Sequence, residues 1–587
     1  MHRSRPSPNH RPAALPWFVL AFLIGTILAC SPPPPRTRLT PVPAELSADR
    51  SSATTGAQEA TATLPSAGGE LAPARYEVAG ELHLAVRETI RTLNPFATNN
   101  ESEAFVTAML YDHLMEYEPG NGFVANLAER WEIAADGGRL IIWLDPRARW
   151  QSGAAVTVDD VVFTYRFIRE RSLPGWSAVA AAVHRVEAIS AREVQFTLLN
   201  PSPEVIRRVC AEVPIVPAAL WRDLEDPLSH TNLERPIGSG PFFLDEYIPE
   251  EQVVLRNMQA HHSTQPAIAA LVVEIVRDET KALHKLNEGS LDALGWDVLP
   301  SVVGDVRDHP ELYPGVLWAS VAGSVQRAVL LNVRLPPYND PQLRLALTQA
   351  LDAASIVDQV MLGFGEPSSS DPFAPASEWH DAAGPLVAYD PQAAGTGLDT
   401  AGYLDVNGDG LRDMPDGTAL QIPITAASAE TQQRVAEMIV ACWKAVGIAS
   451  RVVRITPEEM LPTLMGASFE AVLADLAVRD PDDIYLYVHS SQGDLKGSLV
   501  SGRNYGGHAS DTVDRTVELL REASEPSSRL RLLRETQAIL SSELPWLPLF
   551  SPQVLSLYSE TRFSGWSPVS GIGLLDRRVI ARLVAQE

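Results

Sequence analysis

The chain has 587 residues, of which 73 are Asp or Glu and 47 are Lys or Arg, so its formal net charge is −26. A charge this negative argues against nucleic acid as a partner, because binding to phosphates relies on clustered Lys and Arg. The length allows a globular body of two or three domains.

The first 29 residues have the pattern of a secretory signal. Arg3, Arg5 and Arg11 precede an apolar run over residues 17–29 that is too short to span a bilayer comfortably. Removing this segment takes away three Arg and no acidic residue, which leaves 44 basic against 73 acidic residues and a net charge of −29.

The end of the signal is more specific. Residues 27–30 read Ile-Leu-Ala-Cys, which resembles the lipobox of bacterial lipoproteins, in which the Cys becomes the lipidated N-terminus. We therefore expect cleavage after Ala29 and acyl chains on Cys30, which would hold the protein at the membrane surface. The alternative is an ordinary cleaved signal with a chance Cys.

Residues 30–78 are expected to form a disordered tether. They are rich in Pro, Ser, Thr and Ala, and no aromatic residue occurs in 31–75. Such a stretch cannot bury enough apolar surface to offset the entropy of ordering it.

The remaining body is predicted to be mixed α/β. Strand-like runs occur at 253–255 and 272–276, and amphipathic helices are expected over 429–446 and 510–540. Thr157 and Asp160 form a capping-box variant that opens a helix from 158 to about 169, and Asp136-Gly137 reads as a hairpin turn.

Several enzyme signatures are missing from the sequence. It contains no HExxH, GxSxG, SxxK or GxxxxGK[ST] pattern, which disfavours a zincin, a nucleophile-elbow hydrolase, a penicillin-binding enzyme and a P-loop ATPase. His261-His262 could suggest a metal, but adjacent residues point to different sides of a strand and no third ligand is near in sequence, so a structural or surface role is expected. Cys210 and Cys442 are expected to be buried free thiols.

One loop fits the spacing of an EF-hand calcium loop. Residues 405–416 read DVNGDGLRDMPD, which places Asp405, Asn407, Asp409, Asp413 and Asp416 at ligand positions with Gly at the turn. Asp in place of Glu at the last position and the absence of an evident helix pair weaken the match. A polar turn between a helix and a strand explains the same residues. No cofactor is otherwise required.

From about Glu81 onward, the chain resembles bacterial extracellular solute-binding protein family 5. The landmarks that carry the resemblance follow the family's order: 127–132 (LAERWE), 150–163 (WQSGAAVTVDDVVF, with Gln-Ser in place of a polar-acidic pair), 237–242 (IGSGPF), Asn332 with Pro336-Pro337, Asp340 and Arg344, 390–403 (DPQAAGTGLDTAGY) and 545–549 (PWLPL).

The resemblance implies an α/β, two-lobed periplasmic-binding-protein-like fold (type II, large peptide-binding class) with an inserted small domain and a hinge. Lobe I would comprise 79–118, 206–322 and 548–587, the small domain 119–205, and lobe II 323–547. The implied function is capture of extracytoplasmic peptides or a similar small solute by hinge closure and delivery to an ABC permease and its ATPase, without catalysis and as a monomer.

Two other functional classes stay open. One is an exported hydrolase that acts on peptide or glycan in the same cleft, and the other is a structural or sensory lipoprotein whose cleft binds nothing.

The resemblance also implies where a peptide's α-ammonium would be held. Peptide-binding relatives use an Asp shortly before an acidic-Pro pair, and Asp475 matches that Asp, although its spacing to Asp480-Pro481 is about two residues longer than expected. Asp480 is a second candidate, and Arg479 could pair with either carboxylate or take a ligand carboxylate. The alternative is that Asp475 caps a strand end or faces solvent.

Overall fold

A computed structural model describes residues 37–38, 80–118, 121–134, 138–199, 201–384, 386–523 and 525–586. The predicted signal, Cys30, nearly all of the predicted tether and the Asp136-Gly137 turn lie outside these residues. The described residues from Thr37 onward belong to one compact unit.

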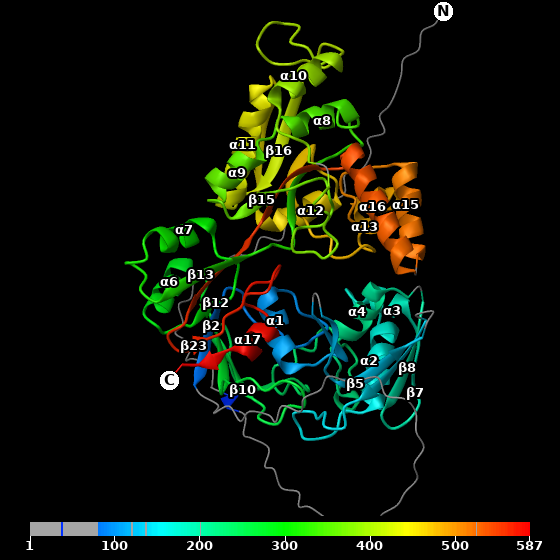
Figure 1. Cartoon of the computed structure of the whole chain (residues 1–587), viewed down its shortest axis with the longest axis vertical. Helices are drawn as coiled ribbons and strands as arrows, with labels where there is room; N and C mark the ends of the chain where they lie inside the picture. Colours follow the sequence, from blue (N-terminus) through cyan, green and yellow to red (C-terminus); the bar gives the residue numbers. More distant parts are fainter. Residues whose placement is uncertain are drawn as a thin grey trace, which may run out of the picture. The chain divides into compact units, whose positions relative to one another are not determined.

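The first part of this unit, which we call lobe I, is built on an eight-stranded sheet (Figure 1). β2 lies at its centre and pairs in parallel with β11 and β12, while β9 and β10 form an antiparallel hairpin beside them. In sheet order the strands are β1 (Thr37–Arg38), β9 (Phe242–Ile248), β10 (Gln252–Asn257), β11 (Ala270–Ile275), β2 (Glu81–Val86), β12 (Ala293–Leu294), β22 (Val554–Ser559) and β13 (Val316–Val321).

Lobe I also carries four helices and a terminal hairpin. The helices are α1 (Glu101–Leu110), α6 (Glu279–Asn287), α7 (Pro300–Asp308) and α17 (Arg577–Arg582), and the hairpin is β23 (Phe563–Ser564) with β24 (Val584–Ala585).

A smaller four-stranded antiparallel sheet lies within the first third of the chain. Its order is β5 (Ala128–Ile133), β6 (Arg139–Leu144), β8 (Glu193–Leu198) and β7 (Val183–Ala188). Around it in sequence are the hairpin β3 (Met115–Glu118) and β4 (Gly122–Ala125), and the helices α2 (Val158–Glu170), α3 (Ser177–Ala182), α4 (Pro203–Ala211) and α5 (Ala218–Trp221).

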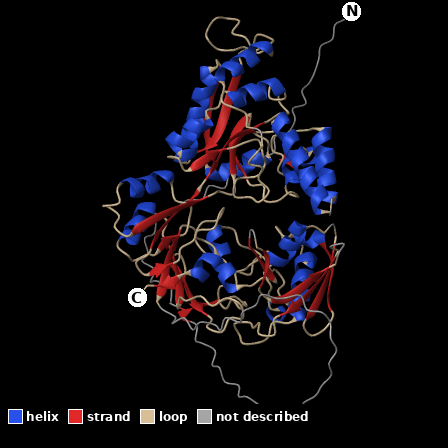
Figure 2. Ribbon diagram, viewed as in Figure 1, coloured by secondary structure: helices blue, strands red, loops and turns tan. Residues whose placement is uncertain are grey.

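Lobe II is built on a six-stranded sheet flanked by helices (Figure 2). Its order is β15 (Gly365–Pro367), β21 (Leu547–Pro552), β14 (Gln326–Leu331), β18 (Ala471–Leu476), β16 (Gln421–Ala427) and β17 (Ala449–Ile455). Its helices are α8 (Pro341–Gln349), α9 (Ala353–Val360), α10 (Pro391–Thr400), α11 (Glu430–Ala445), α12 (Pro457–Met465), α13 (Ile484–Val488), α14 (Ser490–Gly493), α15 (Asp511–Glu522) and α16 (Pro526–Glu543), with a hairpin of β19 (Leu495–Lys496) and β20 (Leu499–Val500).

Two short segments carry the chain between the two large sheets. One joins β13 to β14 and the other joins β21 to β22 through Gln553. They pass so close that a Cβ on Gly323 would lie 2.0 Å from the Pro552 carbonyl oxygen. Glycine is therefore required at 323, because any larger residue would push the two crossing segments apart.

The strand pairing bears on one predicted boundary. The predicted border at 547/548 falls inside β21, which pairs along its length with β14 and β15. The sheets change at Gln553 instead. The other domain limits stay predictions.

Local sequence explains the helix ends. Thr157 and Asp160 form the expected capping box of α2, and α11 begins and ends within a residue of its expected span. The single helix expected over 510–540 is wrong: α15 ends at Glu522 and α16 begins at Pro526. A proline has no N–H to donate and is tolerated in the first turn, where Glu525 caps the new helix.

The hydrophobic core is divided in the same way as the sheets. One large cluster joins the central strands of lobe I to the four-stranded sheet, and separate clusters fill the two faces of the six-stranded sheet. In lobe II, Trp443 is completely buried and its indole Nε1 donates to the Leu347 carbonyl oxygen at 3.2 Å. Each lobe therefore has a core of its own, and one smaller cluster packs Phe364, which follows α9 of lobe II, against residues of lobe I.

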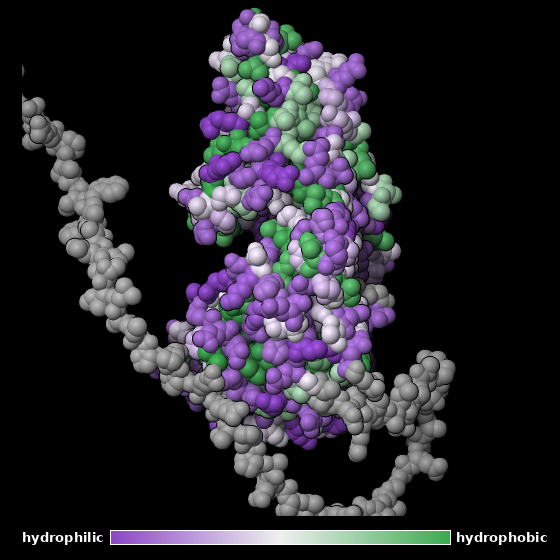
Figure 3. Space-filling view, turned by 90° about the vertical axis from the view of Figure 1, so that its left-hand side faces the viewer, coloured by the Kyte–Doolittle hydropathy of each residue, from purple (hydrophilic) through white to green (hydrophobic). Residues whose placement is uncertain are grey.

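The surface mixes polar and apolar residues closely and is hollowed on one side of the view in Figure 3. Among the described residues, no helix is long and apolar enough to cross a membrane.

Candidate functional site

A bidentate ion pair lies on the strand that leaves the crossing point. Arg327 on β14 and Asp475 on β18 are direct partners across the antiparallel pair, so their side chains share one face of the sheet. Arg327 Nε and Nη2 donate to the two Asp475 oxygens at 2.8 and 3.0 Å, and the guanidinium lies 5.6 Å from the Phe550 ring centre. The Asp475 side chain remains 35 % exposed against 11 % for Arg327, so its carboxylate can accept further donors.

A second carboxylate lies near this pair but comes from lobe I. Asp297 follows β12, and its Oδ1 accepts a hydrogen bond from the Leu555 N–H at 2.8 Å. Burial raises the pKa of Asp297 to about 6, Glu101 adds to the rise, and Arg327 and Arg87 oppose it. The residue is nonetheless exposed to water. A carboxylate that is closely surrounded yet reached by water lies in a recess rather than in a sealed core.

Two buried donor groups in lobe I complete this cluster. The Arg87 guanidinium lies 4.6 Å from the Trp296 ring centre and pairs with Glu279 at 2.9 Å. Arg87 Nε and Trp296 Nε1 are buried and have no hydrogen-bond partner among the described residues. Because an unpaired buried N–H is costly, these donors are suited to an acceptor supplied by a ligand or by water. We call Arg87, Trp296, Asp297, Arg327 and Asp475 the crossing cluster.

Asp480 has a different environment from Asp475. Its side chain is 1 % exposed and lies 2.7 Å from Arg208 Nη2 and 3.3 Å from Arg207 Nη2, two residues of α4. Its other oxygen accepts the N–H groups of Asp482 and Asp483 at 3.0 and 3.2 Å. Partners within the protein thus already satisfy this carboxylate, and the contact joins α4 to lobe II.

A second group of ion pairs lies beside the first. Arg529 Nη2 lies 2.7 Å from Asp482 Oδ1 and 3.2 Å from Glu204 Oε2, and all three side chains are largely buried. The Glu204 contact is an ion pair without good hydrogen-bond geometry, since neither Glu204 oxygen has a directed donor among the described residues. Tyr117 Oη on β3 donates to Glu378 in the loop after β15 at 2.9 Å. Burial and this acceptor raise the pKa of Tyr117 to about 12.

The predicted site residues therefore lie in separate places. Asp475 belongs to the crossing cluster, whereas Asp480 belongs to the contact with α4. Arg479 is exposed, and in the described part of the chain no hydrogen bond or ion pair holds its guanidinium. Roles for all three in ligand binding stay predictions. The sequence did not suggest Arg87, Trp296, Asp297 or Arg327, because each is distant in sequence from Asp475.

The loop over residues 405–416 is folded around its own backbone. The Asp405 oxygens accept the N–H groups of Gly408, Asp409 and Gly410 at 2.7 to 3.2 Å, and Asn407 also accepts from Asp409. The buried Asp413 accepts from the Val406 N–H at 3.1 Å, and Asp416 caps Thr418. Within the described ranges, no three acidic groups of this loop converge within 4.8 Å.

Two other expectations concern histidine and cysteine. His261 and His262 lie in a loop after β10 and not in a strand, so the expected divergence of their side chains is wrong; their rings are 4.3 Å apart. Cys210 and Cys442 are both free, as expected, but only Cys210 is fully buried.

The family model "Bacterial extracellular solute-binding proteins, family 5 Middle" matches residues 122–496. Among curated proteins, the peptide transport periplasmic protein SapA of Salmonella typhimurium is 25 % identical over 503 residues, which cover 80 % of this chain and 86 % of the relative. The dipeptide-binding protein of Escherichia coli is 22 % identical over 465 residues, covering 75 % and 83 %.

Solved structures share the fold. An oligopeptide-binding protein of Thermotoga maritima gives a TM-score of 0.76 at 21 % identity, covering 87 % of this chain and all of the other. The oligopeptide-binding protein AppA of Bacillus subtilis, solved with a nonapeptide, gives 0.70 at 20 % identity, covering 86 % and 99 %. NikZ of Campylobacter jejuni, solved with Ni(L-His), gives 0.71 at 20 % identity with the same coverage.

The two sheets with separate cores, the paired crossing segments and the matches over most of the chain agree: this protein has the two-lobed periplasmic-binding-protein fold and belongs to family 5 of the bacterial extracellular solute-binding proteins.

Proposed function

We propose that this protein is the substrate-binding component of an ABC importer and that it captures short peptides at the crossing cluster. The observation that carries the proposal is the cluster itself: water-accessible carboxylates of Asp297 and Asp475 from two lobes, beside buried N–H donors that have no partner in the described structure. Membership of the solute-binding family and relatives named for peptides support it.

The cluster matches the chemistry of a peptide. A peptide's α-ammonium is a three-donor cation, and a partly desolvated carboxylate such as Asp475 or Asp297 holds it through charge-assisted hydrogen bonds. Carbonyl and carboxylate oxygens of the peptide would accept from Arg87 Nε and Trp296 Nε1. Asp475 retains acceptor capacity because Arg327 uses only one lone pair on each of its oxygens.

Closure of the lobes supplies the mechanism. The two lobes are joined by segments that touch at Gly323 and Pro552, so a small rotation there changes the separation of residues on either side. A ligand that contacts both Asp297 in lobe I and Asp475 in lobe II stabilises the closed form. The ion pairs of Arg207 and Arg208 with Asp480 also join α4 to lobe II.

The direct test is peptide binding by the purified mature chain. A peptide present at about 100 times its dissociation constant stabilises the folded state by about 2.7 kcal/mol, which a thermal-shift screen detects readily. We expect di- to oligopeptides with free N-termini to raise the melting temperature. If sugars or metal chelates raise it and no peptide does, the substrate class is wrong.

We also infer that no bond is made or broken at this site. A pKa near 6 would suit Asp297 as a general acid, which is the feature that an exported hydrolase would use. Incubation of bound peptides with the protein, followed by mass spectrometry, separates the two functions. Intact peptides are expected, and shortened products would establish the hydrolase.

The location follows in part from the family, whose members act outside the cytoplasm. We propose further that acyl chains on Cys30 anchor the protein to the membrane, that a permease and its ATPase receive the ligand, and that the protein works as a monomer without nucleic acid. We retain Ca²⁺ binding by the 405–416 loop as a proposal, since its acidic groups are spaced for an oxygen-preferring ion.

A further inference from the structure

Three potential metal ligands meet inside lobe I, away from the crossing cluster. Asp112 lies two residues after the end of α1, and His261 and His262 lie in the loop after β10. One ligand atom of each residue falls within 4.8 Å of the others, and all three residues are buried. In the described part of the chain this is the single group of three or more His, Cys, Asp or Glu side chains that converges in this way.

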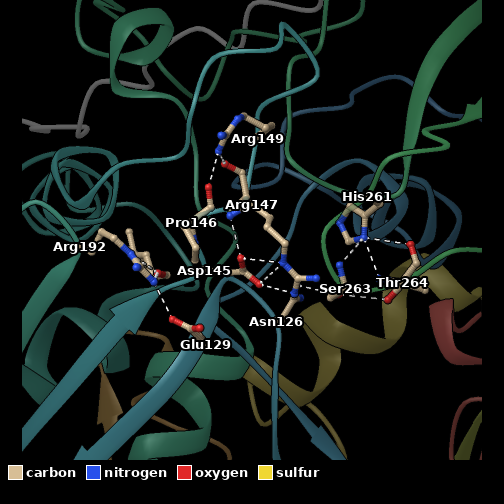
Figure 4. A network of polar contacts seen from close by, with 12 residues as sticks. Asn126, Glu129, Asp145, Pro146, Arg147, Arg149, Arg192, His261, Ser263 and Thr264 are labelled. Carbon is tan, nitrogen blue, oxygen red and sulfur yellow. Dashed lines mark hydrogen bonds and ion pairs between the residues drawn. The ribbon is translucent and has the colours of Figure 1, made fainter. Parts of the chain in front are cut away.

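His261 is oriented as a metal ligand usually is. Its Nε2 lies 3.1 Å from Asp112 Oδ2. Its Nδ1 lies 2.9 Å from the Thr264 backbone nitrogen and 3.0 Å from the Thr264 carbonyl oxygen (Figure 4). One tautomer accepts from the Thr264 N–H and donates to Asp112. The other donates from Nδ1 to the Thr264 carbonyl and turns the Nε2 lone pair toward Asp112, an arrangement that a cation between the two atoms would stabilise.

His262 provides an independent sign of a missing partner. The residue is only 8 % exposed, and its Nε2 is buried without a hydrogen-bond partner in the described structure. A buried imidazole nitrogen normally has one, because losing its contact with water without replacement is unfavourable. Its ring packs against the ring of His261, so the unpartnered nitrogen of His262 lies next to the His261–Asp112 contact.

The buried guanidinium of Arg577 would repel a cation at this position, but it contacts only one of the two Asp112 oxygens. Its Nη1 lies 2.7 Å from Asp112 Oδ1, which is the oxygen that does not face His261. The same nitrogen lies 3.8 Å from Glu116, so the guanidinium is placed between two carboxylates. Asp112 Oδ1 thus has Arg577 as an ion-pair partner and accepts a hydrogen bond from Asn126 Nδ2 at 3.4 Å, which leaves Oδ2 for a metal.

We propose that Asp112, His261 and His262 bind one Zn²⁺ ion, or another divalent transition metal with the same donor preference. Two imidazoles and one carboxylate suit Zn²⁺ with a water in the fourth position, whereas Ca²⁺ and Mg²⁺ prefer oxygen ligands alone. Ligands of a tetrahedral Zn²⁺ lie about 3.3 Å apart, close to the observed separation of His261 Nε2 and Asp112 Oδ2. The ion would link the segment after α1 to the loop after β10; the ligands Asp112 and His261 are 149 residues apart in the sequence.

The test is metal binding by the mature chain, purified without a polyhistidine tag and freed of metal with EDTA. Because the ligands are buried, ZnCl₂ is incubated with the protein for several hours before free metal is removed and bound metal is counted. We expect one Zn²⁺ per chain, a raised melting temperature, and no competition from a large excess of Mg²⁺ or Ca²⁺. Co²⁺ bound in its place should give the absorption bands of a four-coordinate site.

Variants locate the ion. His262→Phe keeps an aromatic ring in the same packing position, and Asp112→Asn keeps the shape of the carboxylate; each should weaken Zn²⁺ binding at least tenfold. His284→Gln removes an exposed histidine on α6 and should leave binding unchanged. Circular dichroism checks that each variant folds. Zn²⁺ bound equally by the parent, His262→Phe and Asp112→Asn would overturn the site, as would a parent that binds no Zn²⁺.

Discussion

The Asp475 carboxylate is the group whose removal most directly tests ligand capture. Asp475→Asn keeps the size of the side chain and removes its charge. If Asp475 holds the α-ammonium of a peptide, this change leaves a cation without its counter-charge in a closed site, which costs about 2–5 kcal/mol. Since the Asp475 side chain is 35 % exposed, the low end applies. A loss of about 2 kcal/mol is about a 30-fold rise in Kd.

The change also affects stability, because Arg327 loses a bidentate partner. The Arg327 side chain is 11 % exposed and would keep only the nearby Asp297 as counter-charge. We expect a loss of about 1–2 kcal/mol in the free energy of unfolding, between the values for exposed and buried ion pairs. Affinity and stability must therefore be measured separately.

A matched control is available in lobe I. Arg256 donates twice to Asp245 Oδ2 between neighbouring strands β9 and β10, at 2.6 and 3.1 Å, so Asp245→Asn removes another cross-strand Asp–Arg pair, outside the crossing cluster. It should lower stability modestly and leave peptide affinity unchanged. Asp482 is unsuitable as a control, because it pairs with the buried Arg529.

Calorimetry with one peptide in free and N-acetylated form completes the test. Acetylation removes the positive charge of the ligand, and Asp475→Asn removes the negative charge that would pair with it. Acetylation should therefore weaken binding to the parent about 30-fold and binding to the variant far less. Equal affinity of the parent for both peptides would refute the clamp. Equal sensitivity of parent and variant to acetylation would place the ammonium elsewhere, with Asp297 the next residue to change.

Four further results are expected. Asp480→Asn should destabilise the protein by about 1–2 kcal/mol in urea unfolding, since Arg207 and Arg208 lose their shared buried partner and keep only Glu212 and Asp483; an unchanged midpoint would contradict the observed pairing. The pKa of Asp297 is raised from 3.8 to about 6 on folding, so the stability it contributes is present below pH 4 and lost as pH rises through 6. The free energy of unfolding of Asp297→Asn should therefore exceed that of the parent by about 1 kcal/mol at pH 7 and match it at pH 4. This value is below the one the full pKa shift would give, because water reaches the group; an equal difference at both pH values would argue against the raised pKa. Cys30→Ser should release the body from membranes or leave the signal uncut, and normal cleavage with membrane retention would disprove the anchor. Calorimetry with Ca²⁺ should show heat of binding to the parent that is lost when Asp405→Ala and Asp409→Ala are combined, and identical heats from the two proteins would disprove the calcium site.

The sequence predicted those helix ends that depend on neighbouring residues. The capping box of α2 and the span of α11 depend on neighbouring residues, and both were predicted to within about a residue. The break before Pro526 was not predicted, although its cause is local: residues 524–529 read SEPSSR, which interrupts the apolar spacing and contains the proline.

The site could not be predicted in the same way, because its contacts are made by topology. Asp475 was identified through the family's order of residues, but its partner Arg327 lies 148 residues away and meets it only because β14 and β18 are neighbours. Asp480 pairs with Arg208 over 272 residues, and Asp112 reaches His261 over 149. Periodicity and spacing carry no information about such contacts.

The central claim is that this protein carries peptides and does not alter them. Native mass spectrometry of the protein purified from its own source measures this directly, because a bound solute adds its mass to the intact chain and can then be released and sequenced. We predict a set of short peptides with free N-termini, released unchanged by denaturation and less abundant on the Asp475→Asn variant. A protein that carries only non-peptide solutes, or that returns added peptides in shortened form, would contradict the account.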